Sequence, residues 1–430
     1  MLFEPCPRRL REPPGTDRYA GNVTTSAGRA VRLRGLLLLG PAFVAAIAYV
    51  DPGNVAANIS GGASFGYLLV WVLVLANVLA GLLQYQSAKL GLVTGRSLPE
   101  LLGDRLGTGA RRAFWIQAEL VAAVTDLAEV LGGAIALYLL FGMPLLLGGV
   151  VIGAVSMVLL IAKDRLGQRV FEGIIIGLLA VIAVGMLFGL FVRPPDPSAV
   201  LGGLVPRLAG PESLVLAASI LGATVMPHAI YAHSAFARDR HGAPSGIPAT
   251  TRLLRATRWD VVIALTIAGI VNLGMLLLAA VNLPGAVGGD AIEQAFAVIV
   301  HHLGAAVGVW FAIGLLASGL ASTSVGSYAG ATIMSGLLRR RVPLLLRRLV
   351  TLIPALVVLG FGVDPTLALV VSQVVLSFGI PFALVPLVSL SSDRAVMGDF
   401  ANTRTMRFVL LVVIFIVVAL NVALITIALA

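Results

Sequence analysis

Long apolar runs that no charge interrupts limit how this chain can fold. Residues 68–83, for example, read LLVWVLVLANVLAGLL. A helix needs about 20 mostly apolar residues to cross a bilayer. Only 12% of the 430 residues are charged, whereas about a quarter are charged in a soluble protein. The pattern predicts an all-α polytopic membrane protein. It excludes soluble enzymes and disordered scaffolds, and it disfavours a β-barrel, whose strands would alternate apolar and polar residues.

Charged residues and Gly/Pro-rich connections divide the chain into eleven candidate membrane spans. These are residues 36–60, 66–91, 113–140, 143–162, 170–192, 213–236, 260–282, 304–336, 349–363, 366–390 and 407–429. The polar tail, residues 1–35, lacks the pattern of a removable signal peptide. Its cysteine, Cys6, is the only one in the chain, so it can form no intrachain disulfide and no metal site by itself. The longest polar connection, residues 238–260, is expected to be a flexible loop.

The positive charges predict how the chain lies in the membrane. If the N-terminus is cytoplasmic, 27 of the 30 Lys and Arg residues fall in the tail and in the loops on the same side. Cytoplasmic loops are rich in Lys and Arg, so the net charge of +10 reflects topology and indicates no nucleic-acid partner. We expect the N-terminus to be cytoplasmic and the C-terminus to be external.

Two spans contain residues that an ordinary membrane helix avoids. Span 1 carries Asp-Pro-Gly-Asn at residues 51–54, and span 6 carries Met-Pro-His at residues 226–228. Because a proline has no N–H, the carbonyl four residues earlier loses its helical partner. These carbonyls belong to Ala48 and Ala223. Unpaired backbone at membrane depth occurs only where it is buried in protein or lines a cavity, so both spans are predicted to be interrupted helices.

The places of the two breaks predict the architecture. Span 1 opens a group of five helices, residues 36–192, and span 6 opens a second group, residues 213–390. The two broken spans cross the membrane in opposite directions. This is the arrangement of a LeuT-like 5+5 inverted repeat, which holds its substrate near the midplane between two discontinuous helices. Residues 193–212 are then an external loop, and residues 407–429 form an extra eleventh helix.

The two breaks offer candidate ligands for a cation. They are the Asp51 and Asn54 side chains, the Ala48 and Ala223 carbonyls and the Met226 thioether. Oxygen-only sites suit Mg²⁺ and Ca²⁺, whereas a soft thioether favours transition metals such as Mn²⁺, Fe²⁺, Co²⁺ or Cd²⁺. Two alternatives stay open. Met226 could be an apolar filler, and Asp51 could be a helix-capping or salt-bridged acid, although a lone carboxylate at this depth is usually functional.

Several segments match the pattern of a known family. They are DPGN and MPH in the two breaks, GNVAANISGGASFGY, TGRSLPELL, WIQAELVAAVTDLAEVLGGA and SQVVLSFGIPFALVPL. From Gly40 to about Leu420, the chain resembles the Nramp family of proton-coupled divalent metal transporters, and its bacterial manganese transporters in particular. Two positions depart from the family's pattern: Ala229 stands where many relatives have Asn, and Leu320 stands where Gln often follows a glycine.

The resemblance implies roles for residues in both breaks and in span 10. The positions that match the family's metal ligands are Asp51, Asn54, Met226, the carbonyl of Ala223, the carbonyl of Ala48 in some states, and Gln373, which approaches the metal as the outer side closes. The resemblance also implies a bacterial inner membrane as the location.

A second group of polar residues lies in span 3. Glu119, Asp126 and Glu129 are seven and three residues apart, which places them within about 80° of one helix face, in a column about 15 Å long. His228 lies in the second break, and His233 follows a little over one turn later. Such residues compose proton relays in membrane helices. A buried salt-bridge network that only holds helices together is the alternative.

The expected partners of the acidic column are Arg347 and Arg348, which open span 9. The resemblance implies that the span 3 acids and these arginines form the family's proton route. His301 and His302 lie near an external loop and are expected to form a solvated face.

The combined expectation is a secondary active transporter that imports Mn²⁺, and also Fe²⁺, Cd²⁺ and Co²⁺, together with protons by alternating access. No nucleotide-binding motif occurs, so we expect no ATP hydrolysis, no enzyme activity and no cofactor. The expected partners are the metal ions, protons and the lipid bilayer. The alternatives are a sodium- or proton-coupled amino-acid symporter of the same fold, a passive cation channel, or a membrane receptor that transports nothing.

Overall fold

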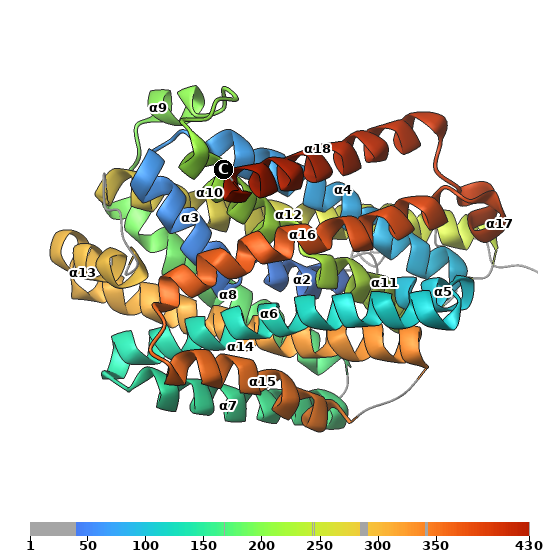
Figure 1. The fold of residues 1–430 in the computed structure, drawn as a ribbon, viewed down its shortest axis with the longest axis horizontal. Coiled ribbons are helices and arrows are strands. Elements are labelled where there is room, and N and C mark those ends of the chain that lie inside the picture. Colours follow the sequence, from blue (N-terminus) through green and yellow to red (C-terminus); the bar gives the residue numbers. More distant parts are fainter. Residues whose placement is uncertain are drawn as a thin grey trace, which may run out of the picture. The chain divides into compact units, whose positions relative to one another are not determined.

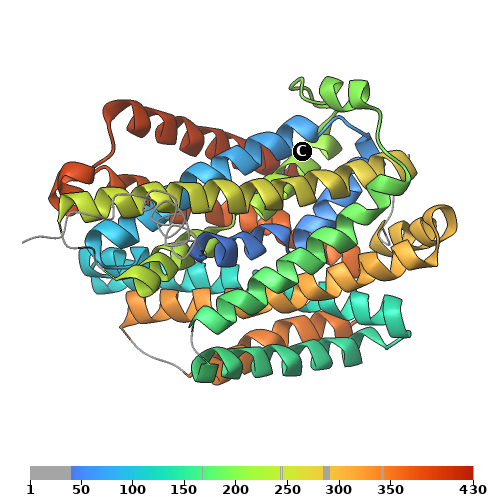
Figure 2. The same cartoon turned by 180° about the vertical axis from the view of Figure 1, so that it is seen from behind.

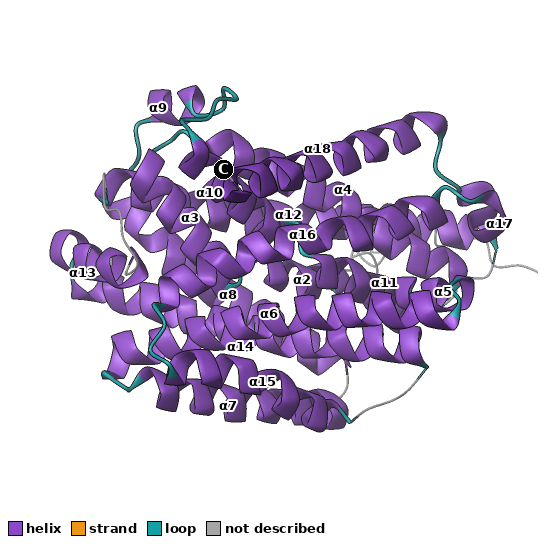
Figure 3. Ribbon diagram, in the orientation of Figure 1, coloured by secondary structure: helices purple, strands orange, loops and turns teal. Residues whose placement is uncertain are grey.

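The computed structural model describes residues 40–166, 168–242, 244, 246–283, 291–339 and 343–429. Within these ranges the chain is built from helices and contains no strand (Figure 3). The polar tail with Cys6 and the first residues of span 1 lie outside the described residues.

The first predicted group of five spans begins with a broken helix (Figure 1). Its elements are α2 (Pro41–Ala46), the 3₁₀ helix η1 (Ile47–Val50), α3 (Pro52–Phe65), α4 (Val70–Thr94), α5 (Leu98–Arg105), α6 (Thr108–Phe141), α7 (Leu145–Leu166) and α8 (Gln168–Val192). The short helix α9 (Pro197–Gly202) lies in the connection to the second group.

The second group also begins with a broken helix. Its elements are α10 (Pro211–Thr224), α11 (Pro227–His241), α12 (Ile247–Asn282), α13 (Ala291–Leu303), α14 (Ala305–Leu338), α15 (Leu344–Gly360) and α16 (Pro365–Ser391). The chain continues through α17 (Arg394–Met397) and the 3₁₀ helix η2 (Gly398–Phe400) to α18 (Arg404–Leu429).

Eight helices in the described part of the chain are long and apolar enough to cross a membrane. They are Val70–Thr94, Thr108–Phe141, Val170–Val192, Pro211–His241, Ile247–Asn282, Ala305–Leu338, Pro365–Ser391 and Arg404–Ile427. The remaining predicted spans correspond to shorter apolar helices. The break divides span 1, the apolar stretch in span 4 is Leu145–Ile161, and α15 has 17 residues with Pro354 inside it. The count of eleven spans stays a prediction.

The expected flexible loop over residues 238–260 is wrong. Helix α11 continues to His241, and α12 begins at Ile247 with Pro248 in its first turn. Proline is favoured there because the N–H it lacks would have no helical partner anyway. Arg252, Arg255 and Arg258 therefore lie on a helix. His301 and His302, at the end of α13, are both exposed, as expected.

The two broken helices pack against each other. Helix α2 contacts α11, and α3 contacts α10, so the first half of one broken helix lies beside the second half of the other. This pairing requires the two to run in opposite directions. Helices α4, α12, α14 and α16 pack around them, and Figure 2 shows α2, in dark blue, surrounded by other helices.

Candidate metal site

The first break is centred on Asp51, which lies between η1 and α3 with an extended backbone (φ −75°, ψ 167°). Its Oδ1 accepts hydrogen bonds from the backbone N–H of Asn54 at 2.7 Å and from Asn54 Nδ2 at 2.8 Å. This is the contact of a helix N-cap, with Pro52 at the first helical position. The second oxygen, Oδ2, is buried and has no hydrogen-bond partner. Asp51 therefore caps α3 with one oxygen and leaves the other free to bind a cation.

The second break is centred on Val225 and Met226, which separate α10 from α11. The carbonyl of Ala223, in the last turn of α10, accepts a hydrogen bond of 2.9 Å from Asn54 Nδ2. The Asn54 amide thus bridges the two breaks, and its Oδ1 is buried without a hydrogen-bond partner. Met226 is completely buried.

Two polar side chains that the sequence reasoning missed support the end of η1. Asn272 Nδ2, on α12, donates to the carbonyl of Tyr49 at 2.6 Å, and Ser318 Oγ, on α14, donates to the carbonyl of Val50 at 2.5 Å. A carbonyl that lacks its helical partner must be satisfied in a membrane. The sequence signal is weak, since it consists of an isolated Asn and Ser in apolar helices. Ala48 is buried in the preceding turn, and its role as a ligand stays a prediction.

Gln373, on α16, lies against the first break. A Cβ added at Gly53 would lie 1.8 Å from Gln373 Nε2, and a Cβ added at Gly222 would lie 2.1 Å from the Gln373 carbonyl. Glycine at 222 permits the close approach of the α16 backbone to α10, and glycine at 53 leaves room for the Gln373 side chain beside α3. Gln373 Oε1 is buried without a hydrogen-bond partner, while Nε2 donates to Ser372 Oγ at 3.1 Å.

The candidate site therefore contains oxygen atoms that nothing in the described protein satisfies. They are Asp51 Oδ2, Asn54 Oδ1 and Gln373 Oε1. Burying unpaired polar atoms is costly, so a cluster of them beside one negative charge is suited to a cation. All six candidate ligands are at most 1% exposed, which closes the site on both sides. The described residues contain no group of three His, Cys, Asp or Glu side chains that could hold a metal, so a site here depends on amide, carbonyl and thioether donors in addition to the Asp51 carboxylate.

The acidic column lies on α6 and faces α15. Arg347 Nη2 lies 2.9 Å from Glu119 Oε1, and Arg348 Nη1 lies 3.2 Å from Asp126 Oδ1. Arg348 and Asp126 are almost fully buried, whereas the Glu119 side chain is 23% exposed. Glu129 is buried beside Gly326 of α14, and its Oε2 has no hydrogen-bond partner.

The two histidines of α11 lie in different surroundings. His228 Nδ1 is 3.4 Å from Thr125 Oγ1 of α6, so this histidine links the second break to the acidic column. His233 Nδ1 is 2.6 Å from Gln84 Oε1 of α4, and Gln84 in turn donates to the Tyr49 hydroxyl. The structure therefore places His233 in a network with α4 and the first break rather than with the acids.

Ion pairs and caps link the helices at the end of the molecule that carries Arg96, Arg238 and Arg339, which we call the arginine-rich end. Glu100, in α5, accepts from Arg238 of α11 at 2.5 Å and from the Ser97 N–H at 2.8 Å. Asp260, in α12, accepts from the N–H groups of Gly40 and Ala42 at 3.0 and 2.9 Å, which holds the start of α2. Burial raises the pKa of Glu100, but the hydrogen bonds from Ser97 and Arg238 outweigh it and lower that pKa below its usual range. Glu100 therefore stays ionised at neutral pH.

The comparisons with known proteins agree with this geometry. The family profile described as natural resistance-associated macrophage protein-like (Nramp) matches residues 42–426. The chain is 62% identical over 388 residues to the "Divalent metal cation transporter MntH" of Mycobacterium tuberculosis, which covers 90% of this chain and 91% of that one. It is 46% identical over 407 residues to MntH of Klebsiella pneumoniae, with 94% and 97% covered.

Two solved structures define the fold. A crystal structure of the Eremococcus coleocola manganese transporter, in complex with an aromatic bis-isothiourea substituted compound, matches with a TM-score of 0.83 and 32% identity over 92% of this chain and 88% of that one. MhsT in complex with L-phenylalanine matches with a TM-score of 0.57 and 13% identity over 89% and 98%, and shares the fold alone. The predicted all-α LeuT-like fold is confirmed. The family profile and the MntH relatives show that this chain belongs to the Nramp family.

Proposed function

We propose that this chain is a secondary active transporter that imports divalent transition metal ions, Mn²⁺ first among them, together with protons by alternating access. The observation that carries the proposal is the cluster of buried, unpaired oxygens on Asp51, Asn54 and Gln373 between two broken helices that also bury Met226. The names of the MntH relatives and of the Eremococcus coleocola manganese transporter support it.

The donor set favours a transition metal over Mg²⁺ or Ca²⁺. Asp51 supplies the one charge in the site, the amides and carbonyls supply neutral oxygens, and Met226 supplies a polarizable sulfur. Hard cations gain little from a thioether and lose part of a complete oxygen shell when one occupies a ligand position. Mn²⁺, Fe²⁺, Co²⁺ and Cd²⁺ tolerate the mixed set, and these are the proposed substrates.

We propose that the proton leaves the site along a different pathway from the metal ion. Asp51 and His228 lie at the breaks, and the contact between His228 and Thr125 leads to α6. There Glu129 has one unpaired buried oxygen, and Asp126, Arg348, Glu119 and Arg347 continue toward the arginine-rich end. Neighbouring carboxylates and guanidinium groups can exchange a proton along such a chain. His233 is the weakest candidate, because its neighbour is Gln84.

The proposed orientation has the arginine-rich end in the cytoplasm, which makes uptake inward across a bacterial inner membrane. The 27 Lys and Arg residues on one side support this orientation. The site is closed on both sides, as expected for one state of an alternating-access carrier and not for an open pore.

An amino-acid symporter is the nearest rival, since MhsT in complex with L-phenylalanine shares the fold. In such carriers the half-helix N-termini face the substrate carboxylate. Here Asp51 is the N-cap of α3, so the carboxylate of an amino-acid substrate would meet the negative charge of Asp51. The geometry favours a cationic substrate.

The decisive experiment is Mn²⁺ uptake into liposomes that contain the purified chain, with and without an inward proton gradient, in competition with Cd²⁺, Ca²⁺ and an amino-acid mixture. We expect saturable Mn²⁺ uptake that the gradient stimulates and that Cd²⁺ inhibits. Inhibition by amino acids but not by Cd²⁺ would favour the symporter. Uptake that does not saturate would indicate a channel.

A further inference from the structure

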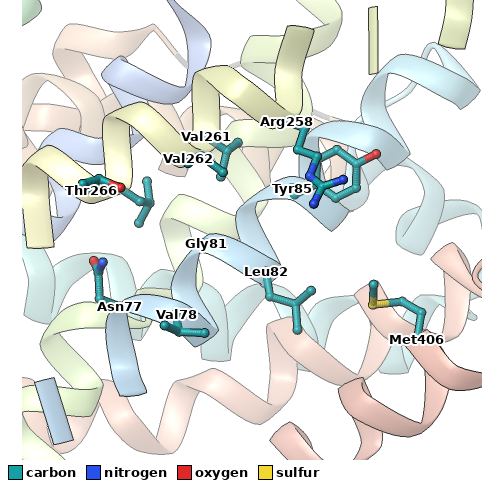
Figure 4. Close-up of a pocket in the computed structure, with 11 residues that line it drawn as sticks. Asn77, Val78, Gly81, Leu82, Tyr85, Arg258, Val261, Val262, Thr266 and Met406 are labelled. Atoms are coloured by element: carbon teal, nitrogen blue, oxygen red, sulfur yellow. The ribbon is translucent and has the colours of Figure 1, made fainter. Parts of the chain in front are cut away.

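A groove lies between α4 and α12, beside the start of α18 (Figure 4), and none of the candidate metal ligands lines it. Its volume is about 440 Å³. The residues that define it are Asn77, Gly81 and Tyr85 of α4, Arg258 and Val262 of α12, and Met406 of α18.

The groove faces the surroundings of the protein. Val78 and Val262, which line it, are 62% and 46% exposed. Both α4 and α12 are long and apolar enough to span a membrane. In a bilayer, the groove therefore opens to lipid.

The middle of the groove is shaped for an apolar chain. From Arg258 to Thr266 it follows α12 for nine residues, which is about 12 Å along a helix. The side chains between these ends are aliphatic, including Leu82, Val261 and Leu265. The groove is open at Gly81, where an added Cβ would have no other atom within 4 Å.

One end of the groove carries a positive charge and the kinds of residue that are found at a membrane interface. Arg258 and Tyr85 lie together at this end, as Figure 4 shows, and both line the groove. Trp259, next in sequence to Arg258, is 61% exposed. Tyr and Trp gather where the hydrocarbon core meets the lipid headgroups. We therefore expect the Arg258 guanidinium to lie at headgroup depth, at the end of an apolar channel.

The charge at this end is positive, and no carboxylate in the described part of the chain neutralises it. Arg258 makes no ion pair with any described residue. Asp260 is close in sequence, but it is buried and accepts from the backbone of Gly40 and Ala42. Arg407, which follows the groove residue Met406, is exposed as well. A guanidinium in this setting is complementary to a phosphate group, which it can bind through two parallel hydrogen bonds.

We propose that this groove is a binding site for one anionic phospholipid from the leaflet at the arginine-rich end. The phosphate binds Arg258, and one acyl chain occupies the channel between α4 and α12. Basic pockets between membrane helices are known to hold anionic headgroups. The lipid would join α18 to the rest of the helices through Met406. The proposal requires only that the chain lies in a membrane, so it stands or falls independently of the proposed transport.

The test is native mass spectrometry of the purified full-length chain, titrated with phosphatidylglycerol and, separately, with phosphatidylcholine. We expect the unmodified chain to bind one phosphatidylglycerol about fivefold more tightly than phosphatidylcholine, since one basic side chain at a membrane surface contributes about 1 kcal/mol. Arg258→Gln should abolish this preference. The matched control, Arg252→Gln, removes an equal charge from an exposed position on the same helix outside the groove and should keep the preference.

A second variant tests the acyl-chain channel. Gly81→Leu places a side chain in the open space of the groove and should weaken the binding of both lipids, with the melting temperature in lipid-free detergent unchanged. The proposal is overturned if Arg258→Gln behaves like the unmodified chain, or if Arg252→Gln loses as much preference, because the effect would then be diffuse surface charge. It is also overturned if the spectra show a dimer that Gly81→Leu dissociates, since a second copy of the chain would then occupy the groove.

Discussion

Asp51 shows how one residue can serve both folding and binding. Its Oδ1 caps α3 through Asn54, while its Oδ2 remains unpaired in a fully buried position. The sequence alone left a capping acid and a metal ligand as alternatives. The geometry makes them compatible, because the two oxygens have different surroundings.

Asp51→Asn should separate these two roles. Asn is as good an N-cap as Asp, so the helix should form, but the one negative charge of the site is lost. We expect Mn²⁺ affinity in calorimetry to fall by about 100-fold or more, as when one partner of a buried charge pair is removed. Mn²⁺ uptake should be nearly abolished. An unchanged affinity would contradict the assignment of the site.

Met226 should determine selectivity more than affinity. Specificity is a difference between affinities. Without the sulfur, the site offers only hard oxygen ligands and leaves space for water. We expect Met226→Ala to retain substantial Mn²⁺ uptake, to weaken Cd²⁺ uptake, and to admit Ca²⁺ or Mg²⁺. The ratio of Ca²⁺ to Mn²⁺ uptake in liposomes measures this. Met275→Ala, which truncates another fully buried methionine, controls for the cavity, and an equal change in both variants would place selectivity elsewhere.

At the scale of elements, α16 lies close to α3 at Gly53. A Cβ at Gly53 would lie 1.8 Å from Gln373 Nε2, so Gly53→Ala must displace the Gln373 side chain from the first break or push α16 away from it. We expect a loss of about 1–3 kcal/mol of stability, as for an overpacked core, and a larger proportional loss of Mn²⁺ uptake. Gly81→Ala is the control, because a Cβ there meets open space. If both variants melt and transport alike, the close approach has no functional importance.

Helix α6 carries the acids that we propose for the proton route. Glu129→Gln keeps the shape of the side chain but cannot take up and release a proton. We expect Mn²⁺ binding to persist while proton influx falls by about tenfold or more and uptake loses its stimulation at acid pH. Asp126→Asn should have a smaller effect of the same kind. Paired Mn²⁺ and proton influx in the same vesicles at several pH values measures both fluxes.

A suitable control for these variants is Glu212→Gln, at an exposed position in the first turn of α10. It removes a carboxylate outside the column and should change neither flux. Proton influx that stays at the parent level in both α6 variants would make the column a structural salt-bridge network, and the relay would have to be withdrawn.

At the scale of elements, the prolines made the two breaks predictable, because the loss of an N–H is a local property of the sequence. The groups that satisfy the freed backbone were not predictable. Asn272 and Ser318 lie more than 200 residues from the carbonyls they bind. The partner of His233 could not be predicted for the same reason. Helix periodicity shows which side chains share a face of one helix, but it does not identify the helix that packs against that face. The start of α12 was missed because its polar first turns resemble a loop.

Across the whole molecule, the packing of α2 on α11 and of α3 on α10 agrees with the inverted repeat that the paired breaks predicted. This packing is antiparallel, so it is the same whichever side of the membrane is cytoplasmic. The predicted direction of transport therefore rests only on the asymmetric distribution of Lys and Arg in the sequence. It requires a test of its own.

The single cysteine of the chain offers that test. If the arginine-rich end is cytoplasmic, Cys6 in the tail should not react with a membrane-impermeant maleimide in intact cells and should react once the membrane is permeabilised. In a Cys6→Ser chain, Leu201→Cys places a thiol at a 65% exposed position on α9, between the two repeats, and this thiol should react in intact cells. The two sites control each other, because the positive-inside rule requires opposite accessibility. The reverse result would invert the topology, and proton-driven import through this site would then have to be replaced by export.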